Sequence, residues 1–221
     1  MNIYLISGLG ADKHAFDRLV FPDDYMRYHL SWLEPEPKES LTSYAHRMAE
    51  GIDRSQKFVL IGLSFGGIVG IEISKFLKPE KLIIISSISH RQELPWYFRQ
   101  VGQFGLHRSM LIQYIKKSDR LLFWFFGTRS SKLQAYLKER IQATSVNYLK
   151  WSLHQITHWK QTQKPAGLIH IHGSKDKLFP IQYCQPDIII SGGSHFMVIT
   201  HASVISAKIK EILNEAESTS E

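Results

Sequence analysis

Short runs of consecutive apolar residues recur along this chain, separated by stretches in which apolar residues are spaced three or four apart. Continuous runs are typical of strands covered on both faces, and the wider spacing is typical of amphipathic helices. The runs interpreted as strands are Ile3–Ser7, Tyr28–Leu33, Phe58–Gly62, Leu82–Ser86, Leu168–His172 and Asp187–Ile190. The helices expected between and after them are His14–Val20, Leu41–Arg54, Ile68–Leu77 and Ala202–Asn214. This alternation predicts an α/β fold with about six mostly parallel strands flanked by helices.

The alternation stops in residues 89–164, which contain several helical stretches and no clear strand. Ser131–Ala143 and Val146–Trp159 have the spacing of helices, and Leu121–Phe126 is apolar all round. An insertion of this kind between two strands predicts a helical cap, residues 89–164, on a core formed by residues 1–88 and 165–221. Leu121–Phe126 is expected to pack as a helix between the cap and the sheet.

Length and composition are those of an ordinary soluble protein, with 221 residues, 43% of them hydrophobic and 21% charged. No stretch approaches the roughly 20 apolar residues of a membrane span, and the N-terminus lacks the basic leader of a signal peptide. Cys184 is the single cysteine, which excludes an intrachain disulfide and fits a reducing compartment. These features predict a cytoplasmic location.

The charge of the chain is unevenly distributed. The formal net charge is +7, but residues 91–166 contain 13 Lys and Arg against 3 Asp and Glu, and the rest of the chain is slightly acidic. A basic segment of this kind would attract an anionic ligand. A solvated basic surface without a ligand is the alternative.

The pattern Gly62-Leu63-Ser64-Phe65-Gly66 lies between an apolar run and a helical stretch. In that setting G-x-S-x-G is typical of a serine on a tight strand-to-helix turn, where side chains at the bracketing positions would clash. The turn would present the Ser64 hydroxyl at a helix N-terminus. A turn in which the glycines only allow close packing is the alternative.

A serine nucleophile needs a base, and the base needs a partner that fixes its tautomer. Asp176 and His195 each follow an apolar run further along the chain. Both are therefore expected in loops at the carboxyl ends of parallel strands, the edge at which open α/β sheets bind ligands. We predict that Ser64, Asp176 and His195 form a catalytic triad.

The same chemistry needs N–H donors for the negative charge that develops on a substrate oxygen. The Phe65 N–H follows the nucleophile directly. A second donor is expected from the turn Gly8-Leu9-Gly10 after the first strand, because glycines let the backbone approach the site. Leu9 is the expected donor, with Gly10 as the alternative.

Three stretches together resemble the alpha/beta-hydrolase superfamily over nearly the whole chain: the turn at residues 62–67, the His172-Gly173 turn with Asp176, and Gly192-Gly193-Ser194-His195-Phe196. The first strand and its glycine turn resemble the family's third strand. The family's first two strands have no counterpart, so a six-stranded sheet is expected. One departure is Ser7, where the family often has histidine.

The resemblance implies a serine hydrolase that cleaves a carboxylic ester or thioester through an acyl-enzyme intermediate, with no cofactor and no metal. The expected partner is a small acyl ester or thioester, and the basic cap extends the expectation to anionic or carrier-linked substrates. The cap of the family is variable and sets substrate choice. Trp96, Trp124 and Phe125 are the candidate pocket residues.

Several alternatives remain open at this stage. One is a non-catalytic binding protein on the same fold, and another is an acyltransferase or C–C bond hydrolase that uses the same triad. A nucleic-acid or membrane-surface module would need aromatic and basic residues on one exposed face. Helical spacing instead places most of the tryptophans in the core, so no nucleic-acid partner is expected. His170 and His172 share a strand face as metal ligands would, but no third ligand is evident.

Overall fold

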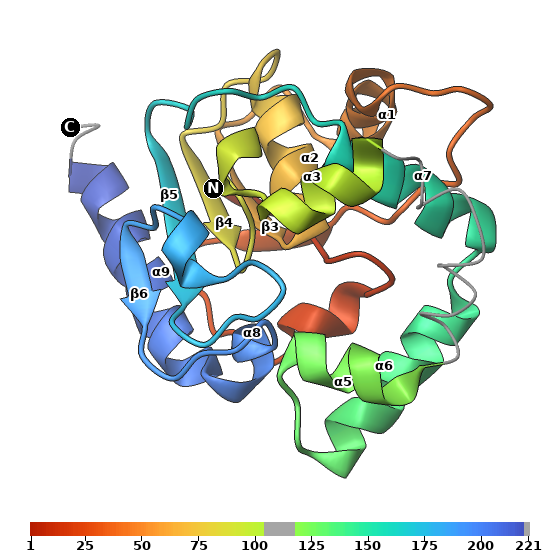
Figure 1. The fold of residues 1–221 in the computed structure, drawn as a ribbon. Coiled ribbons are helices and arrows are strands. Elements are labelled where there is room, and N and C mark those ends of the chain that lie inside the picture. Colours follow the sequence, from red (N-terminus) through yellow and green to blue (C-terminus); the bar gives the residue numbers. More distant parts are fainter. Residues whose placement is uncertain (104–117, 219–221) are drawn as a thin grey trace.

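The computed structural model describes residues 1–103 and 118–218, and in it six parallel strands form one twisted sheet with helices on both faces (Figure 1). The spatial order of the strands is β2-β1-β3-β4-β5-β6, and every neighbouring pair is parallel. Their bounds are β1 Asn2–Ile6, β2 Met26–His29, β3 Phe58–Leu63, β4 Lys81–Ile85, β5 Leu168–Gly173 and β6 Ile188–Ile190. The predicted number of strands and their parallel direction are confirmed.

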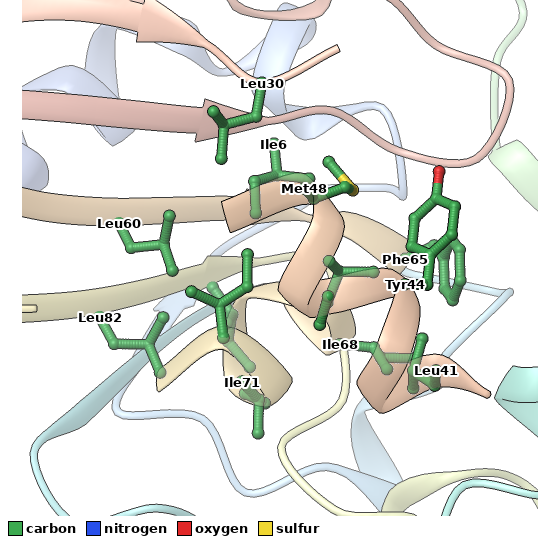
Figure 2. Packing of buried hydrophobic residues seen from close by; sticks show 14 of the residues in the cluster. Ile6, Leu30, Leu41, Tyr44, Met48, Leu60, Phe65, Ile68, Ile71 and Leu82 are labelled. Atoms are coloured by element: carbon green, nitrogen blue, oxygen red, sulfur yellow. The ribbon is translucent and has the colours of Figure 1, made fainter. Parts of the chain in front are cut away.

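The inner strands are apolar throughout because both faces of the sheet are covered. In β1, Tyr4 and Ile6 face one hydrophobic cluster and Ile3 and Leu5 face the other. The first face is covered by α1 (Leu41–Met48) and α2 (Phe65–Ser74), and the second by α8 (Met197–Thr200) and α9 (Ala202–Ser218). Figure 2 shows side chains of β1, β3 and β4 meeting those of α1 and α2. α2 is buried on all sides, Glu72 included, since it lies between the sheet and other helices.

Two elements differ from the prediction. The strand expected at Tyr28–Leu33 lies earlier, at β2 (Met26–His29), because this edge strand is set by its pairing with β1 and is largely exposed, so burial does not mark it. The helix expected at His14–Val20 is a single 3-10 turn, Lys13–Phe16, capped by Asp12. The chain then leaves the helical path and buries Leu19, Phe21 and Tyr25 against the sheet.

Between β4 and β5 lie only helices in the described part of the chain. They are α3 (Trp96–Gln103), α5 (Asp119–Phe126), α6 (Ser131–Ala143) and α7 (Val146–Thr157), with a 3-10 turn at Arg91–Glu93, and residues 104–117 of the predicted cap lie outside the described residues. α6 and α7 begin where expected, because Ser130 and Ser145 accept hydrogen bonds from the backbone of the first turn. The division into core and cap remains a prediction.

Two further helices end or begin differently from expectation. The predicted helix Leu41–Arg54 stops at α1 and continues only as a 3-10 turn, Ala49–Gly51, and α2 begins at Phe65 directly after the serine. Another 3-10 turn, Ile181–Tyr183, precedes β6. Within residues 1–103 and 118–218, no helix combines the length and apolar character needed to cross a membrane.

Candidate active site

Ser64 occupies the turn between β3 and α2 with φ 52° and ψ −120°, a backbone conformation that is strained for a residue with a side chain. The bracketing glycines are required by close backbone contacts. A Cβ atom on Gly62 would lie 2.4 Å from the carbonyl oxygen of Gly66, and one on Gly66 would lie 2.3 Å from that of Ile6. The Ser87 hydroxyl, in the loop after β4, donates to the Ser64 carbonyl at 2.7 Å and holds the turn.

Ser64, His195 and Asp176 are joined by hydrogen bonds, although 131 residues separate the serine from the histidine. His195 Nε2 lies 3.0 Å from Ser64 Oγ, and His195 Nδ1 lies 2.8 Å from Asp176 Oδ2. All three side chains are buried. Because the ionised carboxylate only accepts hydrogen bonds, Nδ1 carries the proton and Nε2 is free to accept from the serine hydroxyl.

The carboxylate of Asp176 is held by its own turn. Asp176 Oδ1 accepts the backbone N–H groups of Leu178 at 2.8 Å and Phe179 at 2.9 Å, which leaves Oδ2 for His195. Burial raises the pKa of Asp176, but His195, through its charge and its hydrogen bond, then His172 and the Phe179 N–H, lower it by more. The net effect is a pKa below the usual range of a carboxyl, so Asp176 is ionised at neutral pH.

His172 and His170 form a second buried pair behind Asp176. His172 Nε2 donates to the Phe179 carbonyl at 2.8 Å, so its Nδ1 is the acceptor for His170 Nε2 at 3.0 Å. Burial lowers the pKa of both rings, that of His170 to about 2, and keeps them neutral. The pair therefore braces the turn at residues 176–179, and nowhere in the described ranges do three His, Cys, Asp or Glu side chains gather as metal ligands would.

The turn after β1 lies directly beside Ser64. A Cβ atom on Gly8 would be 3.3 Å from Ser64 Cβ, and both Leu9 and Phe65 line the cavity in front of the serine. The indole Nε1–H of Trp32 points at this turn, with Ser7 Oγ at 3.0 Å and the Gly8 carbonyl at 3.1 Å. The structure thus brings the two expected oxyanion donors, Leu9 and Phe65, to the same place as Ser64.

A cavity of about 400 Å³ opens in front of Ser64 and His195. Phe125 lines it, as expected for a pocket residue, together with Tyr97, Phe98 and Phe126. Trp96 and Trp124 do not line it, because they are 59% and 53% exposed. The Lys177 ammonium lies over the Trp124 ring, 4.6 Å from its centroid. On each helix, the aromatic residue next in sequence faces the cavity.

The inserted helices contact the candidate site in two places, at His195 and at the segment after β1. The Phe126 ring of α5 lies edge-on against the His195 imidazole, with centroids 5.2 Å apart. On α6, Arg140 pairs with Asp12 at 2.8 Å, and the Tyr136 hydroxyl donates to the same carboxylate at 3.2 Å. Asp12 follows the glycine turn of β1, so α6 is tied to the segment that carries Leu9.

Sequence reasoning missed three residues that shape this site. Trp32 supports the glycine turn, Phe126 packs on the histidine, and Phe179 fixes the aspartate. Nothing local to Trp32 marks its contact. Phe126 belongs to the apolar run 121–126, which already pointed to a contact between the insertion and the sheet. Cys184 is buried, and burial raises the pKa of its thiol, so it remains an unreactive core residue.

Comparisons with known proteins bear on the fold alone. No protein-family model matches the chain, and a search of curated proteins found no match. Three solved structures superpose on 95% to 97% of the chain: a bromoperoxidase from Bacillus anthracis, a thermophilic esterase, and a lipase-esterase related protein from Clostridium acetobutylicum. Their sequence identities are 17%, 15% and 17%, their TM-scores 0.71, 0.72 and 0.68, and the shares of their own chains covered 91%, 90% and 93%. The protein has the alpha/beta-hydrolase fold.

Proposed function

We propose that this protein is a serine hydrolase that cleaves a carboxylic ester or thioester through an acyl-enzyme intermediate. The observation that carries the proposal is the chain of hydrogen bonds from Ser64 Oγ to His195 Nε2 at 3.0 Å and from His195 Nδ1 to Asp176 Oδ2 at 2.8 Å. A nucleophile within reach of a base, with the base held by a carboxylate, is the arrangement that acyl transfer needs. The structural neighbours include a thermophilic esterase, which agrees with this chemistry.

In the first half of the reaction, Ser64 Oγ attacks the substrate carbonyl carbon and its proton passes to His195 Nε2. Asp176 stabilises the resulting imidazolium. The carbon–oxygen or carbon–sulfur bond to the leaving group then breaks, and the leaving group takes the proton from His195. The acyl group remains bonded to Ser64 Oγ.

In the second half, a water molecule attacks the acyl carbon and gives its proton to His195. The bond to Ser64 Oγ breaks, the serine recovers that proton, and the acid leaves. The negative charge of each tetrahedral intermediate is held by the N–H groups of Phe65, at the N-terminus of α2, and of Leu9, in the turn braced by Trp32. One such donor contributes about 3 kcal/mol of transition-state stabilisation.

An acyltransferase or a C–C bond hydrolase would use the same three residues, and the acceptor or the bond would differ. A binding protein without catalysis is less well supported, because binding alone gives no reason to keep a strained serine hydrogen-bonded to a histidine. The helices between β4 and β5 supply much of the cavity wall, so we assign residues 89–164 the role of a substrate-selecting cap.

A fluorophosphonate probe tests the proposal directly. It should label the wild-type protein at Ser64 and leave Ser64→Ala unlabelled, and hydrolysis of a para-nitrophenyl ester should fall by several orders of magnitude in that variant. Ser206→Ala, which removes a buried hydroxyl on α9, is the matched control and should remain labelled. Equal labelling of wild type and Ser64→Ala would overturn the assignment of the nucleophile.

A further inference from the structure

The described residues that line the cavity beside Ser64 are mostly apolar. Apart from Ser64 and His195, its described lining has only four polar side chains: Tyr97, Tyr136, Arg140 and Thr157. The side chains of Tyr136 and Arg140 donate hydrogen bonds to the Asp12 carboxylate. Thr157 Oγ1 donates to the Leu153 carbonyl of the same helix. Among the described lining residues, no charge is therefore left without a partner to pair with a charged substrate, and burying an unpaired charge is strongly unfavourable.

Arg140 is the one Lys or Arg side chain among the described lining residues, and its position does not favour an anionic substrate. Its guanidinium lies between the carboxylates of Asp12 and Glu139, which balance its charge. A substrate carboxylate that approached Arg140 would meet both acidic groups. Two other basic residues of the insertion also form ion pairs, Lys138 with Asp119 and Lys164 with Asp187.

Apolar residues line the cavity from two separate packing clusters. One cluster joins α5, α6 and α8 and contributes Leu122, Leu137, Ile141 and Phe196. The other belongs to the core under α1, α2 and α7 and contributes Phe65, Leu94 and Phe179, with Phe98 and Ile156 packed against it. In Figure 1, α5 and α6 lie on one side of the strand ends and α3 and α7 on the other. The cavity thus has apolar side chains on two of its sides.

The mechanism indicates which side holds which part of the substrate. His195 must give its proton to the departing oxygen, so the leaving group lies next to its ring. That ring is bordered by Phe126, which packs on Phe196 with centroids 5.4 Å apart and belongs to the side of α5 and α6. The acyl group is then directed toward the opposite wall, where Leu149, Leu153 and Ile156 of α7 face the cavity.

We propose, as a deepening of the proposed function on which it rests, that the substrate is an uncharged ester with apolar groups on both sides of its carbonyl. Its alcohol part binds against α5 and α6, and its acyl part binds against α7. This class differs from the anionic or carrier-linked substrates that the basic segment suggested, since a carrier would put a large charged group where the alcohol part binds.

The wild-type protein is assayed first with para-nitrophenyl esters of acetate, butanoate, pentanoate and octanoate. The value of kcat/KM should rise about fourfold for each methylene that enters the cavity. The para-nitrophenyl hemisuccinate, in which a carboxylate replaces the end of the pentanoyl chain, should be at least about 100-fold slower than the pentanoyl ester. Benzyl octanoate should be cleaved faster than ethyl octanoate, and octanoyl-CoA more slowly than either.

Two matched leucine variants test the direction of binding. Leu153→Ala on α7 should raise kcat/KM for the longest acyl chain severalfold relative to acetate, without changing the preference for benzyl over ethyl alcohol. Leu137→Ala on α6 should increase the preference for benzyl over ethyl octanoate without changing the ratio of octanoate to acetate, and Leu137→Val, which also removes volume, serves instead if the alanine variant does not fold. The same shift in both variants would overturn the assignment of the two sides.

Labelling of Ser64, measured beside the substrate series, distinguishes a wrong substrate class from a wrong assignment as a serine hydrolase. If the fluorophosphonate labels Ser64 but the hemisuccinate or octanoyl-CoA is cleaved as fast as the uncharged esters, the substrate class is wrong and the serine hydrolase stands. If Ser64 is not labelled and no ester is cleaved, both proposals are overturned.

Discussion

The Phe126 ring contacts the His195 imidazole edge to face, with centroids 5.2 Å apart and planes at 86°. Phe126 is the last residue of α5, in the insertion, and His195 lies in the loop that follows β6. The adjacent Gly127 has φ +67°, and a Cβ atom there would lie 2.7 Å from Ser194 Cβ. The insertion and the histidine loop therefore touch at two consecutive residues, so the position of α5 bears on the orientation of the His195 imidazole.

We predict that Phe126→Ala lowers kcat roughly tenfold, because the imidazole loses one of the surfaces that orient it and catalysis depends steeply on alignment. Phe126→Leu should retain most of the activity, since an apolar side chain still fills the space. Ester hydrolysis and thermal unfolding are measured together. A drop in kcat that only follows loss of folded protein would contradict the positioning role.

The hydrogen bonds from Trp32 to the turn after β1 give a second prediction. Trp32→Phe keeps the stack on Phe65, whose ring lies 5.4 Å away, but removes the N–H that holds Ser7 and Gly8. Because the turn carries the proposed donor Leu9, kcat should fall about tenfold, less than the loss of a donor itself.

Trp151→Phe is the control for Trp32→Phe. It removes a similar indole hydrogen bond, 2.8 Å long, to the carbonyl of Glu39, which is not part of the site. Both variants should lose about 1 kcal/mol of stability in urea unfolding. Equal effects of the two variants on kcat would remove any special role for Trp32.

The buried His170 predicts that the protein loses stability in mild acid. Burial lowers the pKa of His170 to about 2 in the folded protein, whereas an unfolded chain has a histidine pKa of about 6.5. Between these values the unfolded state binds a proton that the folded state does not, so stability is full above about pH 6.5 and falls as the pH decreases. The lowered pKa of His172 acts in the same direction.

The measurement is the free energy of unfolding in urea at several pH values between about 5 and 7, a window above the titration of Asp176. Each neutral buried histidine should contribute a slope of up to about 1.4 kcal/mol per pH unit. His170→Leu should reduce the slope. An unchanged slope in that variant would show that His170 is not kept neutral by the fold.

Two glycines of the same helix should respond in opposite ways to alanine. In Gly66→Ala the new Cβ would lie 2.3 Å from the Ile6 carbonyl oxygen and 2.4 Å from that of Ser7, so two backbone segments must separate. We expect a loss of more than about 3 kcal/mol or no folded protein. In Gly70→Ala the nearest atom is a Leu60 methyl at 3.6 Å, an ordinary contact, and higher helix propensity should add up to about 1 kcal/mol. Thermal unfolding of both variants, followed by circular dichroism, measures the two changes in stability. A Gly66→Ala variant as stable as the wild type would contradict the steric account.

Local sterics and local hydrogen bonds explain the features that could be predicted from the sequence. The glycines around Ser64 allow the close backbone contacts of a tight turn between a strand and a helix. Ser130 and Ser145 cap α6 and α7, which therefore begin at the expected residues. The apolar runs at β1, β3, β4 and β5 identify strands buried on both faces. The order of Ser64, Asp176 and His195 suggested one site because parallel strands end at one edge of the sheet.

Only the tertiary structure decided the features that depend on contacts between distant segments. The bounds of β2 are set by its pairing with β1. In the segment that follows β2, Trp32 donates a hydrogen bond to the glycine turn. Tyr97 and Phe125, rather than Trp96 and Trp124, face the cavity because neighbouring positions on a helix point in different directions and packing selects which faces inward. A local pattern specifies a turn or a helix, whereas the distance from residue 64 to residue 195 depends on how the whole sheet is assembled.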